Sequence, residues 1–238
     1  MINLSQYPYL ASGLLSVIIA ILAYIFLPSS RKFMMISGLA LTFLSIASYF
    51  FYFYFQESYW TTKRLFNWSY GIEDLLFAFP AGSVIAFWGS VIFNLNIDKK
   101  FDKTLFFRRF FFVTLIEMIF IVLLLFAGID IMNVTIIAQV ILFIIFSFIN
   151  RHAMLISLIT AAAYTSFYFV MLKLLFFIFP AFINDWNGYA LWKSSILGVP
   201  TEEIVWVFTF NAAWVHLLIF YLNINVLTLK KNYCGRKN

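Results

Sequence analysis

Seven long apolar stretches, separated by short polar segments, make up most of this chain. A helix that crosses a membrane needs about 20 mostly apolar residues. The stretches run from Tyr9 to Leu27, Phe33 to Phe55, Asp74 to Leu95, Phe110 to Gly128, Met132 to Phe148, Ala153 to Phe179 and Glu202 to Leu227. We therefore predict an all-α integral membrane fold of seven transmembrane helices, in one membrane domain over residues 1–238.

The composition agrees with this fold and excludes other classes of protein. Of the residues, 64% are hydrophobic and 11% are charged, which a soluble domain does not show. The net charge of +6 comes from short basic clusters between apolar stretches, so we expect no nucleic acid as a partner. Cys234 is the only cysteine, so neither an intramolecular disulfide nor a cysteine metal site can form.

The positions of the basic residues predict the orientation in the membrane. Twelve of the 16 Lys and Arg residues fall on one side of the predicted helices: Arg31, Lys32, Lys99, Lys100, Lys103, Arg108, Arg109, Arg151, Lys230, Lys231, Arg236 and Lys237. The other side has Lys63, Arg64, Lys173 and Lys193. Because basic residues stay on the cytoplasmic side, we expect a multi-pass protein of the cell membrane with its N-terminus outside and its C-terminus inside. We expect the first stretch to be retained, since no Ala-x-Ala-like cleavage site follows it.

Two rare features recur in the two halves of the chain. The only adjacent acidic doublets are Glu73-Asp74 and Glu202-Glu203, and each is followed 20 residues later by an Asn-x-Asn triplet. The whole pattern repeats at an offset of 129, with GIEDLLFAF matching PTEEIVWVF. We interpret this as a parallel 3+1+3 repeat: unit one at about 9–96, a connector helix at about 110–128 and unit two at about 132–228. The third and seventh helices would then face each other.

The doublets are the leading candidates for chemistry. Acidic residues at a helix start also cap free N–H groups and complement the helix dipole, and this simpler role stays open. Consecutive helical residues point about 100° apart, so only one member of each doublet can point at a shared interface. Two carboxyls brought close together resist ionising at the same time, which keeps one proton available for donation.

Other polar residues have simpler interpretations. Glu117 is either a partner for an interior polar group or a side chain that reaches Arg108 or Arg109. His216 is more often a packing residue than a base, and the Asn-x-Asn triplets fit helix caps or interhelical hydrogen bonds. Trp60, Trp68, Trp186 and Trp192 fit an aromatic belt, and those near the doublets could stabilise a cation.

The segment LGVPTEEIVWVFTFNAAW, Leu197 to Trp214, resembles the Pro-x-Glu-Glu signature that opens the last helix of the integral-membrane lycopene cyclases. GIEDLLFAF at Gly71 resembles its counterpart in the first half. That family has two homologous units, either as a heterodimer or fused in one chain. The resemblance implies that Glu202, Glu203, Glu73 and Asp74 are required for cyclisation. The sequence departs from the family at Gly71, where the family has Pro, and in the Ile-Val-Trp that follows Glu203.

This resemblance implies an isomerase that closes a β-type ring on an acyclic, lycopene-like carotenoid within the lipid bilayer. Protonation of a terminal double bond starts such a reaction, and no net redox change occurs. We expect no cofactor, because the sequence contains no dinucleotide or phosphate-loop motif, and no metal. The alternatives are a parallel-repeat transporter and a non-catalytic membrane protein that binds carotenoid or lipid. A retinal photoreceptor is excluded, since the seventh stretch has no lysine for a Schiff base.

Overall fold

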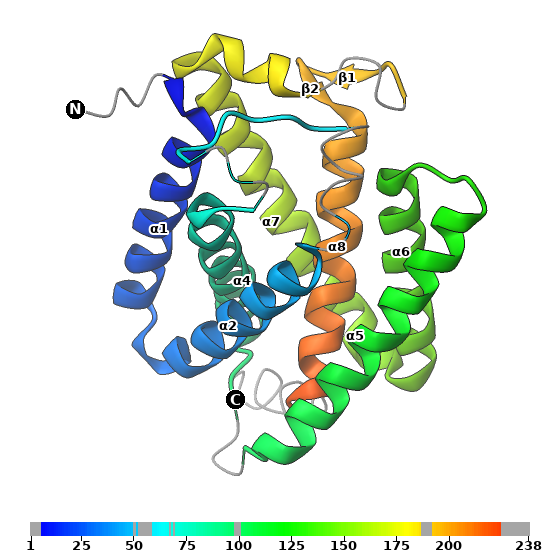
Figure 1. The fold of residues 1–238 in the computed structure, drawn as a ribbon. Coiled ribbons are helices and arrows are strands. Elements are labelled where there is room, and N and C mark those ends of the chain that lie inside the picture. Colours follow the sequence, from blue (N-terminus) through cyan, green and yellow to red (C-terminus); the bar gives the residue numbers. More distant parts are fainter. Residues whose placement is uncertain are drawn as a thin grey trace.

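A bundle of long α-helices forms the computed structural model, which describes residues 6–49, 51, 59–66, 68, 70–97, 101–186 and 192–224 (Figure 1). Seven long helices lie in this part of the chain: α1 (Pro8–Phe26), α2 (Arg31–Ala47), α4 (Ile72–Phe93), α5 (Lys103–Phe126), α6 (Ile131–Ile149), α7 (Arg151–Ile178) and α8 (Thr201–Tyr221). The short elements are the 3-10 helices η2 (Pro28–Ser30) and η3 (Pro180–Asp185) and a hairpin of β1 (Ser195–Ile196) and β2 (Val199–Pro200). The predicted all-α class is confirmed.

Six of these helices are long and apolar enough to cross a membrane, which supports a multi-pass membrane protein. They are α1, α4, α5, α6, α7 and α8. The prediction gave seven such helices. The difference is α2, which has 17 residues and ends at Ala47, whereas the predicted span ran from Phe33 to Phe55. Residues 50 and 52–55 of that span lie outside the described residues.

Local sequence signals explain where several helices begin and end. Asp102 caps α5 by accepting a hydrogen bond from the Leu105 N–H at 3.0 Å, so this helix begins seven residues before the predicted Phe110. Asn94 and Asn223 adopt left-handed backbone conformations, with φ of 55° and 52°, directly after α4 and close after α8. A left-handed residue ends a helix, so α8 stops before the predicted Leu227. Asn225, Cys234 and the basic residues of the tail, like Lys99 and Lys100, lie outside the described residues.

The helices form two groups. Helix α4 packs mainly on α1 and α2, and α8 packs mainly on α6 and α7. The main contact between the groups joins α4 to α7, while α4 and α8 meet over a smaller area. Helices α4 and α8 run in the same direction, from the upper to the lower end of Figure 1. The expected facing of the third and seventh helices therefore holds only in part, because within the second group α7, and not α8, provides most of the contact with α4.

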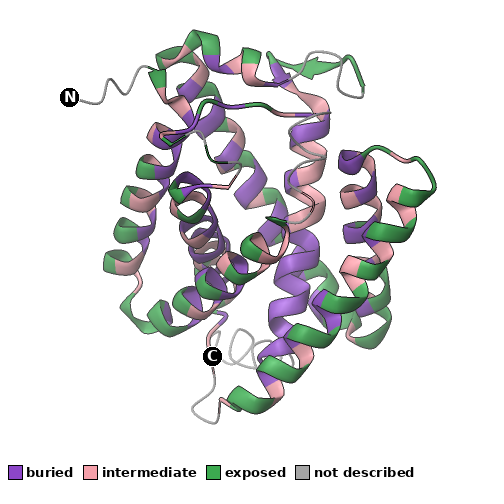
Figure 2. Cartoon of the chain, viewed as in Figure 1, coloured by how far each residue is buried: buried purple, intermediate pink, exposed green. Residues whose placement is uncertain are grey.

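Burial is distributed as expected for a protein surrounded by lipid (Figure 2). Helix α8 is buried along most of its length, whereas α5 exposes large apolar side chains such as Phe112, Leu115 and Leu123. The buried interior contains acidic groups: Glu73, Asp74, Glu202 and Glu203 are each at most 6% exposed. Polar groups inside an apolar bundle are costly unless they are hydrogen-bonded, so their partners identify the candidate site.

Candidate active site

Each acidic doublet occupies the second and third positions of its helix. Helix α4 begins at Ile72, one residue before Glu73, and α8 begins at Thr201, one residue before Glu202. The first turn of a helix favours anions because its free N–H groups and dipole are positive. The same helix positions thus hold both doublets, in agreement with the sequence offset.

The residues just before these two helices differ in their hydrogen bonding. The Gly71 N–H donates to Asp74 Oδ2 at 2.7 Å and caps α4. Pro200 precedes α8 and has no N–H to donate. Gly71 is also in close contact with the first doublet, since a Cβ atom at this position would lie 2.5 Å from Glu73 Oε2. Gly71 therefore gives Asp74 a backbone partner that Glu203 lacks.

An arginine and a tyrosine complete the surroundings of the first doublet. Arg64, from the segment between α2 and α4, is buried and forms a salt bridge with Asp74. Tyr9 of α1 donates its hydroxyl to Asp74 Oδ1 at 3.0 Å, and its ring lies 5.3 Å from the guanidinium carbon of Arg64. The neighbouring Glu73 accepts the Leu65 N–H at 2.6 Å. Asp74 is thus held as the partner of a buried cation.

Three aromatic donors surround Glu203. Tyr168 of α7 donates its hydroxyl to Oε1 at 2.7 Å, and Tyr59 donates to Oε2 at 2.7 Å. The indole N–H of Trp186, at the end of η3, donates to Oε2 at 3.3 Å. Burial, followed by the Glu203 carboxylate, raises the pKa of Tyr59 above its ordinary value, so Tyr59 remains a donor at neutral pH. No Lys or Arg in the described part of the chain forms a salt bridge with Glu203.

Two outer segments join above the carboxyls. Trp60 and Trp186 form an isolated antiparallel bridge, with their ring centroids 5.9 Å apart. The Thr61 N–H donates to the Asp185 carbonyl oxygen at 2.8 Å. The segment that carries Tyr59 and Arg64 is thereby fixed to the segment that carries Trp186.

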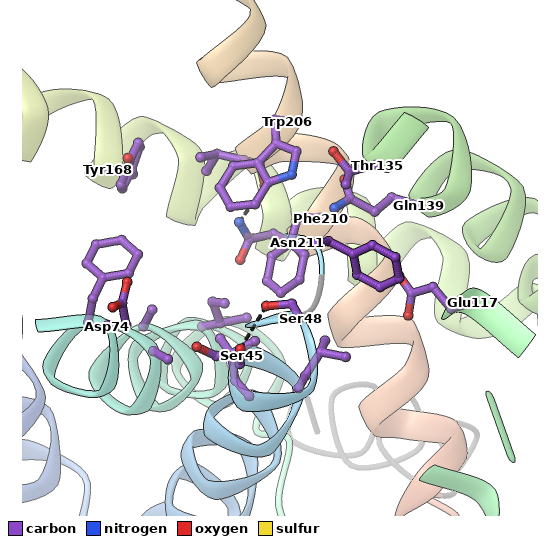
Figure 3. A pocket seen from close by; sticks show the side chains of 18 of the residues that line it. Ser45, Ser48, Asp74, Glu117, Thr135, Gln139, Tyr168, Trp206, Phe210 and Asn211 are labelled. Carbon is purple, nitrogen blue, oxygen red and sulfur yellow. Dashed lines mark hydrogen bonds between the residues drawn. The ribbon is translucent and has the colours of Figure 1, made fainter. Parts of the chain in front are cut away.

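Asp74 and Glu203 line the same cavity. This outer cavity has a volume of about 210 Å³, and its wall also includes Tyr9, Trp60, Phe77, Tyr168, Trp186 and Trp206. A second, inner cavity of about 230 Å³ shares Tyr9, Asp74, Phe77, Tyr168 and Trp206 with the outer one and extends toward α5 and α6 (Figure 3). Neither Glu73 nor Glu202 lines either cavity. The second member of each doublet therefore faces the cavity, and the first member lies behind it.

The remaining candidates divide between the cavity and the packed interior. Glu202 is buried, and its Oε2 has no partner among the described residues. Glu117 lines the inner cavity. Arg109 donates to the Phe220 carbonyl oxygen and forms no salt bridge with Glu117. His216 is 1% exposed, packs edge-on against Phe143 at 5.7 Å and lines neither cavity, as expected for a packing residue.

Sequence reasoning missed four residues of this site: Arg64, Tyr9, Tyr59 and Tyr168. The tyrosines carry no local signal, because they are three of 13 in the chain and their partners are distant in sequence. Arg64 had a usable signal, since it is one of few basic residues on the side expected to be outside, where a buried acidic partner explains its presence.

Comparisons with protein-family models, curated proteins and solved structures found nothing that matches this chain.

Proposed function

We propose that this chain is a membrane isomerase of the lycopene cyclase type, which closes a β-type ring at the end of an acyclic carotenoid. The observation that carries the proposal is the placement of Asp74 and Glu203, from corresponding helix positions, in the wall of one cavity. The rest of that wall is mostly apolar and aromatic. A carbocation needs an acid to form, an anion to stabilise it and the exclusion of water.

Glu203 is the acid in this proposal. Asp74 would have to break its salt bridge with Arg64 to carry a proton, whereas Glu203 has no such cation. Protonated Glu203 donates its proton to the terminal double bond and leaves a tertiary carbocation. A neighbouring double bond attacks this carbon and forms the ring, and the new cation loses a proton to the Glu203 carboxylate. The acid is regenerated and no electrons are gained or lost.

Other cavity residues support the charged intermediates. The Tyr59 and Tyr168 hydroxyls stabilise the Glu203 carboxylate that remains after proton transfer. The rings of Phe77 and Trp206 favour a cation in the cavity. The bridge between Trp60 and Trp186 limits access of water, which would otherwise capture the carbocation as an alcohol.

We further propose that the chain is a parallel repeat of seven membrane helices, with α2 as the shortest crossing. Its 17 residues reach the lower limit of about 17 for a spanning helix. The repeat is supported by the matched doublets, by Asn94 and Asn223 in the same conformation, and by the matched helix partners of α4 and α8. An outside N-terminus and a cytoplasmic C-terminus, in the cell membrane, are supported by the basic residues that begin α2, α5 and α7 at the lower end of Figure 1.

Expression in a host that accumulates lycopene tests the activity. Chromatography of the pigments should show a cyclic carotenoid with the native sequence and none with an empty vector. A protein that accumulates in the membrane and leaves lycopene and shorter acyclic carotenoids unchanged would refute the cyclase. Unchanged carotenoid that copurifies with the protein would instead identify a binding protein.

A further inference from the structure

The inner cavity has a polar wall that the proposed cyclisation does not use. In Figure 3, Asp74 and Tyr168 lie on one side of this cavity, and Thr135, Gln139 and Glu117 lie on the other. Glu117, Gln139 and Asn211 come from three different helices, α5, α6 and α8, and the most buried of the three is Asn211. A hydrocarbon chain gives such groups no hydrogen-bond partner.

Asn211 has an acceptor that no protein group satisfies. The side chain is 1% exposed, and its Nδ2 donates to the Val207 carbonyl oxygen at 2.5 Å. Its Oδ1 is buried and has no hydrogen-bond partner among the described residues. A buried acceptor without a partner loses its hydration and gains nothing in return, so it is rare unless a ligand or water completes it.

Gln139 and Glu117 add unused polar atoms to the same wall. Gln139 is 5% exposed and accepts the Thr209 hydroxyl at 2.9 Å through Oε1, which leaves its Nε2 donor without a partner in the described chain. Glu117 forms no hydrogen bond or salt bridge with the residues that the structure describes. Arg109, about two turns before Glu117 in α5, donates to the Phe220 carbonyl oxygen, and its guanidinium carbon lies 4.4 Å from the centroid of the Phe220 ring.

We propose that the inner cavity recognises a hydroxyl group on the end group of its isoprenoid ligand. A hydroxyl both donates and accepts, so it can donate to Asn211 Oδ1 or Glu117 and accept from Gln139 Nε2. The substrate would then be a hydroxylated acyclic carotenoid in preference to lycopene itself. The isoprenoid class rests on the proposed cyclase function, whereas the preference for a hydroxyl rests on the cavity wall alone.

A binding experiment without turnover tests this preference. The full chain, purified in detergent with Glu203→Gln to prevent reaction, is titrated with lycopene and with lycopene hydroxylated on one terminal methyl group. Quenching of tryptophan fluorescence reports binding, since Trp206 lines the cavity. We expect the hydroxylated carotenoid to have a Kd lower by about tenfold, the effect of a hydrogen bond that completes the buried Asn211 acceptor.

Two variants assign the preference to the cavity wall. Asn211→Leu should reduce the ratio of the two Kd values to about one. His216→Leu is the matched control, because His216 is equally buried in α8 but lines neither cavity, and it should keep the native ratio. Equal affinity of the unaltered cavity for both carotenoids would overturn the proposal. This outcome does not depend on whether Asn211→Leu folds. It would mean that water donates the missing hydrogen bond to Asn211 Oδ1.

The result can be separated from the cyclase proposal. A tenfold lower Kd for the hydroxylated carotenoid, in a protein that cyclises nothing in the lycopene host, would support the hydroxyl site and refute the cyclase activity. Cyclisation of lycopene by a protein that binds both carotenoids equally would support the cyclase activity and refute the hydroxyl site.

Discussion

The Tyr59 hydroxyl donates a hydrogen bond to Glu203 Oε2 at 2.7 Å, across 144 positions of sequence. Tyr59 belongs to the segment between α2 and α4, whereas Glu203 lies in the first turn of α8. This bond, together with the Trp60–Trp186 bridge, joins the two halves of the chain directly at the candidate acid. The second half therefore depends on the first half for one of the groups that hold its carboxyl.

Replacing the two members of the second doublet should separate the acid from its neighbour. Glu203→Gln should lower the rate of cyclisation by about 10² to 10⁴, the usual contribution of a positioned proton donor. Glu202→Gln should have a much smaller effect, since Glu202 does not line the cavity. Product formed per amount of membrane protein in a lycopene-accumulating host measures both. A larger loss of activity with Glu202→Gln than with Glu203→Gln would contradict the assignment of Glu203 as the acid.

Removing the Tyr59 hydroxyl should lower the stability of the protein. Tyr59→Phe removes one hydrogen bond to a buried carboxyl and should lower the free energy of unfolding by about 0.5–3 kcal/mol, the range that spans bonds to neutral and to charged groups. Tyr7→Phe is the matched control. The Lys63 Nζ lies over the Tyr7 ring, 5.0 Å from its centroid, and the Tyr7 hydroxyl forms no hydrogen bond with the described residues. Thermal unfolding of the purified protein in detergent compares them. Equal melting temperatures for the two variants would contradict a stabilising hydrogen bond from Tyr59 to Glu203.

Breaking the buried salt bridge from the basic side should be strongly destabilising. Arg64→Met leaves the Asp74 carboxylate buried without its cation and should lower the free energy of unfolding by about 3–5 kcal/mol. The double variant Arg64→Met/Asp74→Asn should recover a substantial part of this loss, because no unpaired charge remains. Lys63→Met, an exposed neighbour, serves as the control. A double variant that is less stable than Arg64→Met would show that charge pairing is not the cause.

Cysteine labelling in intact cells should determine the orientation. In a Cys234→Ser background, Leu197→Cys in the turn between β1 and β2 should react with a membrane-impermeant thiol reagent. Ser29→Cys, in η2 at the opposite end of the bundle, should react only after the cells are lysed. Both positions are exposed, so burial does not bias the comparison. The reverse labelling pattern would place the doublets at the cytoplasmic side and refute the proposed topology.

Sequence alone was sufficient for features that depend on neighbouring residues. Apolar stretches of the right length predict helices, and the offset of 129 predicts that both doublets occupy equivalent helix positions. These predictions succeed because helix formation and capping depend on residues within one or two turns. The exception is α2, whose end at Ala47 is earlier than the continuous apolar stretch suggests.

Only the tertiary structure decided which carboxyls share a cavity and what holds them. Helix geometry predicts that one member of each doublet faces a shared interface. The packing of α4 and α8 on their neighbouring helices decides that these members are Asp74 and Glu203. Their partners come from segments far away in sequence: Tyr9 lies 65 positions from Asp74. The packing of whole helices selects such contacts, and no local pattern encodes them. The doublets could therefore be recognised from the sequence. The difference between Asp74, which pairs with Arg64, and Glu203, which pairs with no cation in the described part of the chain, could not.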